Sequence, residues 1–387
     1  MKRSILPSLI VASAALLAAC GTTVTGQPTT APSSTGTSTS EAPVIVPAGL
    51  DTGTFPITAQ PLPAPTAEAA WVVEGNRMGD DALIQVNEVD PRLIMGGAIM
   101  RSYPVLSGND LVERVPDATA TAFAANSMRV GMTTTRGDKL DSPTVAVRIG
   151  LYRFDDPQTA LKALEDVRRA TTAQPRIAIT GTDNVLAGEF KPGTVDTYRT
   201  EGPFVINISG TGPTTDEGAA LVAKAYQAEL PKLKAFQPTA TDRVATLPTD
   251  VDAIVSRTLP LDGTESTPLL LVGHYGLNGV LHRIADISKD ADYRNAGIDL
   301  VGQRGNVVYR TRDAAAATAL AAGLNGRNQQ ISGIPQLPSV TCGTHRTTNY
   351  TWCYVPVGRY LSTVSDRTEA TAKQKAAAQF TVLATTK

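Results

Sequence analysis

An Asp-Thr-Gly tripeptide, three cysteines and three histidines are the residues in this sequence that could carry chemistry. The tripeptide is Asp51-Thr52-Gly53, which supplies the catalytic carboxylate of aspartic peptidases. Such a site needs two aspartates that share one proton, each at the end of a buried strand. Here residues 47–50 read Pro-Ala-Gly-Leu, and the chain holds no second Asp-Thr-Gly or Asp-Ser-Gly. We therefore expect Asp51 to bond backbone amides in a turn. A single-copy peptidase assembled as a homodimer is the catalytic alternative.

The first cysteine follows a segment with the layout of a secretory signal peptide. Lys2 and Arg3 precede an apolar run over residues 5–17, which closes as Leu-Ala-Ala-Cys-Gly and resembles the bacterial lipobox. We expect residues 1–19 to be removed and Cys20 to be lipidated, with acyl chains such as palmitate, which places the protein on the extracytoplasmic face of the cell membrane. A chance cysteine in a leader peptide is the alternative.

The other two cysteines, Cys342 and Cys353, lie eleven positions apart on either side of a segment that favours a turn. In an exported protein this spacing predicts a disulfide across a hairpin. A metal site would have to recruit His345 and would still lack a fourth ligand. His274 and His282 are eight positions apart rather than four, which favours hydrogen-bonded polar histidines over a metal pair. We expect no metal, no cofactor and no catalytic residue.

Composition limits the remaining functions. A chain of 387 residues with 42% hydrophobic content usually forms about two domains. The net charge of −1 gives no general attraction to nucleic acids. No segment after the N-terminal region offers the roughly 20 consecutive apolar residues of a membrane-spanning helix.

The pattern of strands and helices predicts two similar halves. Residues 144–154 favour a strand, and a helix capped by Asp156 follows; residues 202–210 favour a second strand, with a helix after Thr214. The second half repeats this order with a helix near Asp313 and a last helix after Asp366, which suggests an internal repeat at a spacing of about 150 to 160 residues. The predicted class is α+β, with two similar domains of mixed antiparallel sheet and helices packed on one face.

The domain boundaries follow from composition. Residues 20–45 are rich in threonine, serine and proline and predict a disordered tether. Residues 46–236 should form an N-terminal α+β domain, and residues 237–250 a polar linker with two prolines. Residues 251–387 should form a C-terminal α+β domain that contains the disulfide.

Several stretches also carry a family resemblance. The lipobox and tether, "LDTGTFP", "GPFVINISG", "LPKLKAF" and "CYVPVGRYLSTVS" resemble an uncharacterised two-domain lipoprotein family of actinobacteria, of the mycobacterial and nocardial type. The similarity spans nearly the whole mature chain. It implies that the "LDTG" segment opens the N-terminal domain and is not a peptidase site. No catalytic residues transfer from this family.

These observations predict a membrane-anchored binding or interaction module of the cell envelope. Its partners would be the membrane, through Cys20, and an envelope protein, lipid or small molecule, but no nucleic acid. The alternative is an envelope hydrolase with an unrecognised active site.

Overall fold

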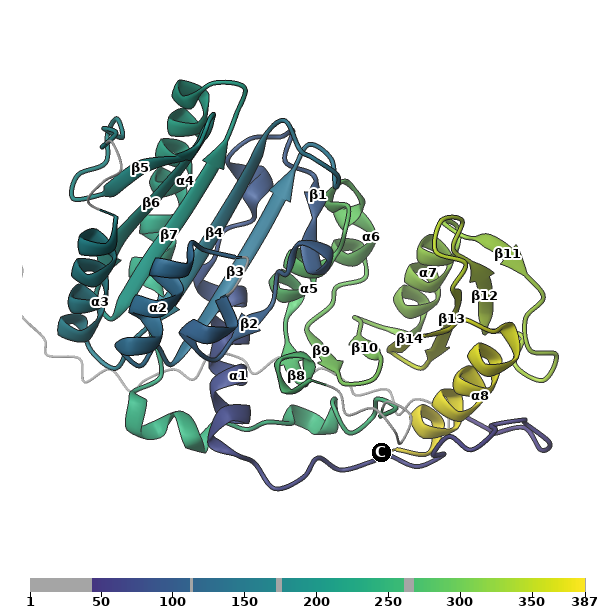
Figure 1. Ribbon diagram of the computed structural model, residues 1–387. Coiled ribbons are helices and arrows are strands. Elements are labelled where there is room, and N and C mark those ends of the chain that lie inside the picture. Colours follow the sequence, from purple (N-terminus) through teal and green to yellow (C-terminus); the bar gives the residue numbers. More distant parts are fainter. Residues whose placement is uncertain (1–43, 112–113, 172–175, 261–267, 387) are drawn as a thin grey trace, which may run out of the picture. The chain divides into compact units, whose positions relative to one another are not determined.

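The computed structural model describes residues 44–111, 114–171, 176–260 and 268–386. The leader, Cys20 and nearly all of the expected tether lie outside these residues. The described chain builds two seven-stranded sheets, and every strand pair within them is antiparallel (Figure 1). No helix in this part of the protein combines the length and the apolar character that crossing a bilayer requires.

The N-terminal sheet has the strand order β1-β3-β4-β7-β6-β5, and β2 pairs with β3. Its strands are β1 Met95–Gly96, β2 Pro104–Val105, β3 Val130–Gly137, β4 Ala146–Arg153, β5 Leu186–Lys191, β6 Thr194–Glu201 and β7 Phe204–Thr211. Its helices are α1 Ala67–Arg77, α2 Asp117–Ala125, α3 Pro157–Ala170 and α4 Thr215–Ala235, and the short helices η1 Met78–Ala82 and η3 Gly97–Met100 lie before the longest strands.

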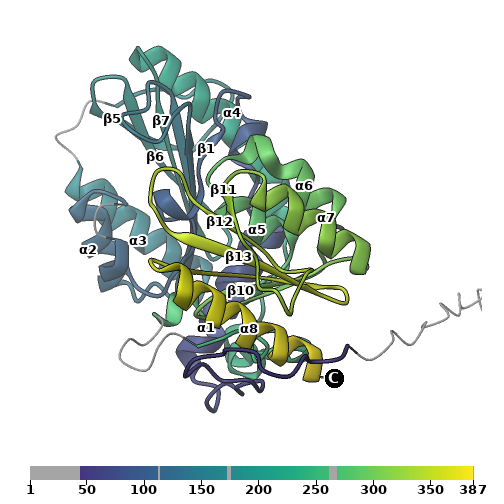
Figure 2. The same ribbon diagram turned by 90° about the vertical axis from the view of Figure 1, so that its right-hand side faces the viewer.

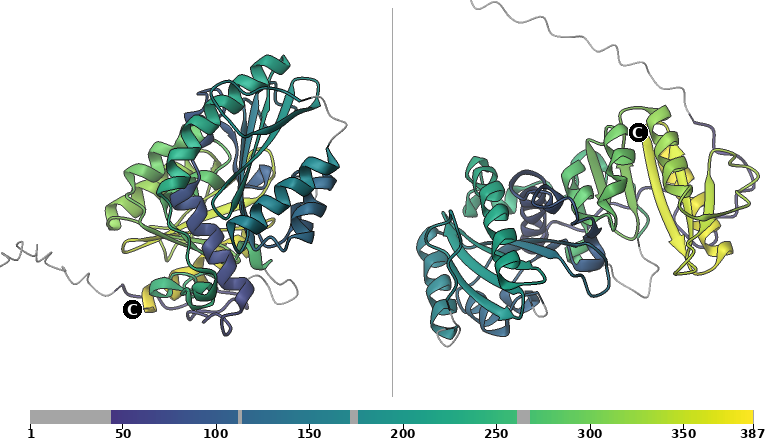
Figure 3. Two further views of the ribbon diagram at one scale, coloured as in Figure 1. Left: turned by 90° about the vertical axis from the view of Figure 1, so that its left-hand side faces the viewer. Right: turned by 90° about the horizontal axis from the view of Figure 1, so that it is seen from above.

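Helices cover both faces of this sheet because its central strands carry apolar side chains on both sides. In β4, Val147, Ile149 and Leu151 belong to the core beneath α4, whereas Tyr152 belongs to the core beneath α2 and α3. The left panel of Figure 3 shows α4 on one side of the strands and α2 and α3 on the other. The predicted α+β class with antiparallel sheets is confirmed, but the helices lie on both faces of the sheet instead of one.

The C-terminal sheet has the strand order β11-β12-β13-β14-β10-β9-β8. Its strands are β8 Gly273–Tyr275, β9 Leu300–Gln303, β10 Val307–Arg310, β11 Gln329–Ile331, β12 Thr341–Thr344, β13 Thr351–Val357 and β14 Tyr360–Asp366. Its helices are α5 Leu277–Arg283, α6 Asp290–Asn295, α7 Ala314–Asn325 and α8 Glu369–Thr385. The core under α8 and the core under α7 again lie on opposite faces (Figures 1 and 2).

The two sheets share one connectivity. The order β3-β4-β7-β6-β5 in the first sheet matches β9-β10-β14-β13-β12 in the second, and α3 and α7 follow the matching strands β4 and β10. At the β6–β7 turn Glu201 pairs with Phe204, and at the β13–β14 turn Val357 pairs with Tyr360. Matching positions in these strands are thus 156 residues apart, within the predicted spacing.

Two expected boundaries differ from the observed packing. Leu50, Phe55 and Leu62 pack against the core of the C-terminal sheet, so this segment does not open the N-terminal domain. Thr239, expected in the linker, donates its backbone N–H to Glu74 of α1 at 3.0 Å and is part of the N-terminal domain's packing. Both segments are polar or proline-rich, so their sequences do not indicate where they pack. They are held by contacts with residues more than 160 positions away in the chain.

Candidate functional site

A groove of about 790 Å³ lies on the face of the N-terminal sheet that α2 and α3 share. Its floor consists of alternate residues from four neighbouring strands, which point to the same face because side chains alternate along a strand. These floor residues are Thr133 and Thr135 of β3, Ala146 and Arg148 of β4, Ser209 and Thr211 of β7, and Thr194 and Asp196 of β6. The walls are Ile99 to Arg101 at the end of η3, Arg114 to Asp117 before and at the start of α2, and Phe190 and Lys191 of β5.

The groove is open because the composition of this face changes along the strands. Where α2 and α3 pack, the strands contribute Tyr152, Tyr198 and Val205 to an apolar core. Toward the other end the same face carries threonine, serine and charged side chains. An apolar helix face would leave these polar groups unpaired, so the helices cover only the apolar half.

Arg114 is the most unusual residue of the groove. It is 6% exposed, and its Nη1 donates to Thr133 Oγ1 at 3.0 Å and to the carbonyl oxygen of Arg101 at 3.1 Å. Its guanidinium lies over the Tyr103 ring, 4.5 Å from the centroid. Among the described residues no carboxylate forms an ion pair with Arg114, and its Nε has no hydrogen-bond partner. Burial lowers the pKa of this guanidinium.

Arg148 is held in place by a network on the groove floor. Its Nη2 donates to Asp196 Oδ1 at 3.2 Å and to Asn207 Oδ1 at 3.0 Å. Asp196 also accepts from Asn207 Nδ2 at 2.9 Å and from the Tyr198 hydroxyl at 2.5 Å. These bonds fix the direction of the guanidinium, while Arg148 Nε finds no hydrogen-bond partner in the described part of the chain.

The Tyr152 hydroxyl is another polar group without a partner beside these arginines. The oxygen is buried and forms no hydrogen bond within the described chain. It lies against Gly150, where a Cβ would come within 2.4 Å of it, so glycine is needed at that position. Burial raises the pKa of Tyr152 to about 12, and Arg148 and Arg114 oppose that rise. The hydroxyl therefore stays protonated and is available as a donor.

The groove is positively charged although the whole chain has a net charge of −1. Among the described residues, its lining contains four basic side chains, Arg101, Arg114, Arg148 and Lys191, and two acidic ones, Asp117 and Asp196, the second of which pairs with Arg148. We call this feature the cationic groove. A concave site with an excess of one charge concentrates ligands of the opposite charge.

The matching position of the C-terminal sheet carries a different kind of side chain. The position equivalent to Asp196 is Trp352, which is half-buried and packs against the core under α7. An apolar ring thus occupies the place that a carboxylate has in the first domain. The cationic groove is therefore a property of the N-terminal sequence and not of the shared fold.

Asp51 makes the contacts of the predicted turn. Its Oδ1 accepts the backbone N–H of Gly53 at 3.0 Å, and its Oδ2 accepts from Gln374 Nε2 of α8 at 3.0 Å. The Gln374 bond and then the Gly53 bond lower the pKa of this exposed carboxyl. A peptidase pair needs one carboxyl whose pKa is raised, so these contacts favour the structural role.

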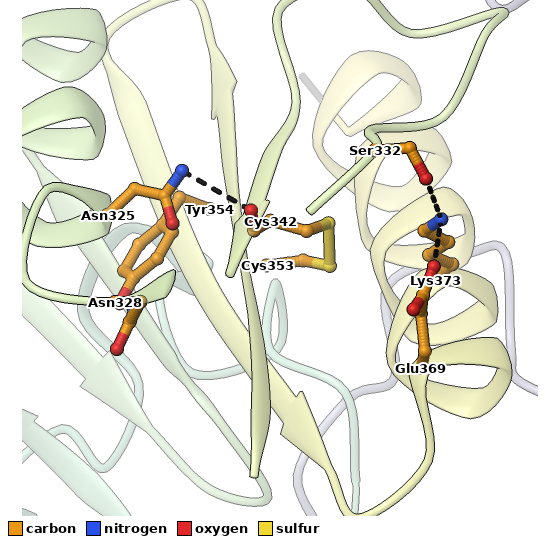
Figure 4. Close-up of a disulfide and its surroundings, with 8 residues drawn as sticks. All are labelled: Asn325, Asn328, Ser332, Cys342, Cys353, Tyr354, Glu369 and Lys373. Carbon is orange, nitrogen blue, oxygen red and sulfur yellow. Dashed lines mark hydrogen bonds and ion pairs between the residues drawn. A yellow bond between two sulfur atoms is a disulfide. The ribbon is translucent and has the colours of Figure 1, made fainter. Parts of the chain in front are cut away.

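The predicted disulfide is confirmed. Cys342 and Cys353 face each other directly in the β12–β13 pair, and their sulfur atoms are 2.01 Å apart (Figure 4). His345 Nδ1 instead accepts the backbone N–H groups of Thr347 and Thr348 at 3.3 Å, inside the turn that joins the two strands.

The other two histidines are hydrogen-bonded, as predicted. His282 is fully buried, with Nε2 3.2 Å from Gln85 Nε2 and Nδ1 3.2 Å from Thr134 Oγ1. His274 Nδ1 lies 3.4 Å from the carbonyl oxygen of Thr249. Within the part of the chain that the structure describes, no three His, Cys, Asp or Glu residues are grouped to hold a metal ion.

Arg114, Arg148 and Asp196 are not among the site residues predicted from the sequence. One signal was available, because the strand "FVINISGT" alternates apolar residues with the polar residues Asn207 and Ser209. A strand buried on both faces does not need such alternation, so it indicates a polar face.

Family comparisons cover most of the chain. Residues 62–249 match the family model described as "Domain of unknown function (DUF7373) N-terminal", and residues 254–386 match "Domain of unknown function (DUF7373) C-terminal". Neither a curated protein nor a solved structure matches the chain. The chain therefore belongs to the two-domain DUF7373 family, and the cationic groove lies in its N-terminal domain.

Proposed function

We propose that this protein is a lipid-anchored, extracytoplasmic lipoprotein whose N-terminal domain binds an anionic ligand in the cationic groove. The observation that carries the binding proposal is Arg114, a buried guanidinium at the groove wall with which no carboxylate of the described residues forms an ion pair. Burying an unpaired charge costs several kcal/mol, and an anion in the groove would offset much of this cost. The volume of about 790 Å³ lies within the range of small-molecule sites.

The chemistry of the groove favours binding over the alternative of hydrolysis. Its described lining contains no histidine and no cysteine. The buried Tyr198 hydroxyl donates to Asp196, and burial and then the Asp196 charge raise its pKa well above the ordinary value. Neither group is thus poised to activate a water or to attack a substrate, because a general base needs a free acceptor near the reacting proton.

The binding proposal predicts a charge-dependent stabilisation by small anions. The probes are acetate, phosphate, citrate and galacturonate, compared at one pH and one ionic strength. We expect a binding anion to raise the melting temperature of the wild-type protein by about 3 to 8 °C when its concentration is about a hundred times its dissociation constant. Arg114→Met should lose this rise. Arg129→Met is the matched control, because Arg129 pairs with Asp155 outside the groove. An equal rise in wild type and Arg114→Met, or no rise with any anion, would contradict the proposal.

The anchor proposal rests on the lipobox that ends at Cys20 and on the threonine-rich stretch after it. Stable anchoring requires more than one acyl chain, and a diacylated cysteine supplies them. We expect Cys20→Ala to move the protein from the detergent phase to the aqueous phase in a Triton X-114 partition. A Cys20→Ala protein that stays in the detergent phase would show that another feature holds it there.

A further inference from the structure

We infer that the ligand of the cationic groove is an acidic oligosaccharide, an elongated chain of sugar rings that carries carboxylate groups. The inference rests on the proposed function, because it requires the groove to bind an anion. Beyond a negative charge, the inference assigns three properties to the ligand: an elongated shape, hydroxyl groups and apolar ring faces.

The basic side chains are spread over the length of the groove. Arg101 and Arg114 stand beside β3, and Lys191 stands on β5. These two strands are separated by β4, β7 and β6, so at about 4.8 Å per strand the groove is about 19 Å long. A single small anion reaches only one end. A ligand that uses both ends must be elongated and carry more than one negative charge.

The floor between the basic ends consists largely of hydroxyl groups. It presents Thr133, Thr135, Thr194, Ser209 and Thr211. A hydroxyl donates one hydrogen bond and accepts two, which matches the hydroxyl groups of a sugar. Thr133 donates to the Arg101 carbonyl oxygen, and Thr194 and Thr211 bond each other. The described residues offer no partner to the Thr135 and Ser209 hydroxyls, so an acyl chain that covered these two is disfavoured.

Two large apolar side chains stand at the rims. Ile99 is 65% exposed and Phe190 is 53% exposed, and both line the groove. Because both line a groove that is otherwise polar, they favour a ligand that has apolar as well as polar surface. The C–H face of a sugar ring supplies such a surface. One sugar ligand could therefore place its hydroxyl groups on the polar floor and its ring faces against Ile99 and Phe190.

An acidic peptide fits these features less well. Extended peptides gain their affinity by adding a strand to a free sheet edge. The groove lies on the face of the sheet, and β3, β4, β7 and β6 are paired along both of their edges. Its floor therefore presents side chains instead of unpaired backbone groups.

Calorimetric titration tests the inference with four probes: tetragalacturonate, its fully methyl-esterified and therefore neutral form, monomeric galacturonate, and the acidic peptide tetraglutamate. Residues 43–387 form one compact unit, so protein that begins at Gly21 carries the whole of it. We expect tetragalacturonate to bind about tenfold more tightly than the monomer, the peptide and the methyl ester.

Variants locate the contacts. Arg114→Met should weaken binding of tetragalacturonate by about ten- to a hundredfold, as expected for loss of hydrogen bonds to a charged group. Phe190 is 53% exposed. Phe190→Ala should weaken binding of the tetramer by about three- to tenfold and leave binding of the monomer unchanged. Leu161→Ala is the control, because Leu161 is equally exposed but lies on α3 outside the groove.

The outcomes separate the two proposals. Equal affinity for monomer and tetramer that still depends on Arg114 would overturn the oligosaccharide and leave anion binding intact. If tetraglutamate bound most tightly, the oligosaccharide would be overturned in favour of an acidic peptide, and anion binding would stand. Equal binding of the methyl ester, or no binding of any anion, would overturn both proposals.

Discussion

Glu74→Ala is expected to lower the free energy of unfolding by about 3 to 5 kcal/mol. The carboxylate is fully buried in α1 and accepts from Arg153 Nη1 at 2.5 Å, Arg77 Nη1 at 2.6 Å and the backbone N–H of Thr239 at 3.0 Å. Alanine would leave the Arg153 guanidinium, which is 3% exposed, without a counter-charge. The cost is large because a buried charge loses its partner and a buried N–H loses its acceptor.

Urea unfolding of the wild type and of Glu74→Ala measures this difference. Glu68→Ala is the control, because Glu68 is exposed in the first turn of the same helix and should change the free energy by less than about 1 kcal/mol. A loss below about 1 kcal/mol for Glu74→Ala would show that the α1–β4 contact does not hold these elements together.

The second large effect is a fall in stability above pH 6.5. Glu229 is fully buried in α4, where its Oε2 accepts the backbone N–H of Ile84 at 3.0 Å and its Oε1 has no hydrogen-bond partner among the residues that the structure describes. Burial raises its pKa from 4.5 to about 8. The folded state therefore keeps this proton while the unfolded state releases it, so stability is lost as the pH rises from 4.5 to 8.

His282 contributes the opposite slope at lower pH. Burial lowers its pKa from 6.5 to about 3, so its contribution is complete above pH 6.5 and is lost as the pH falls toward 3. Between pH 4.5 and 6.5 the two contributions offset each other. Above pH 6.5 the contribution of His282 is constant, and the Glu229 contribution should fall by about 2 kcal/mol by pH 8.

Glu229→Gln tests this assignment, because glutamine retains an oxygen that can accept from Ile84 and cannot ionise. Free energies of unfolding at pH 6.5, 7.25 and 8 should decline in the wild type and stay level in Glu229→Gln. A decline of the same size in both proteins would assign the pH dependence to another group.

Local signals in the sequence predict much of the fold. The strand expected at residues 144–154 is Ala146–Arg153, and the strand expected at 202–210 is Phe204–Thr211. The predicted cap of the next helix is present, since the Asp156 side chain accepts the backbone N–H of Thr159 at 2.8 Å. Residue type and neighbours within a few positions decide such features.

The groove depends on contacts that no local pattern records. Arg101 and Arg114 lie in segments without apolar periodicity and reach the groove because they pack beside β3. Arg148 sits in an ordinary strand, and its role depends on Asp196, 48 positions later. The packing of residues 50–62 on the C-terminal domain likewise depends on residues that are distant in the sequence. The hydrogen bond between Asp51 and Gln374 is one such contact.

The position of a bound anion decides whether the cationic groove is a binding site. Crystals of the protein grown with tetragalacturonate should show one of its carboxylates within hydrogen-bond distance of the Arg114 guanidinium, at 2.7 to 2.9 Å by the usual geometry of charged pairs. The chain of rings should continue over the hydroxyl floor toward Phe190 and Lys191. Density for the ligand on another surface, or a groove filled only by water at saturating ligand, would contradict anion binding at this site.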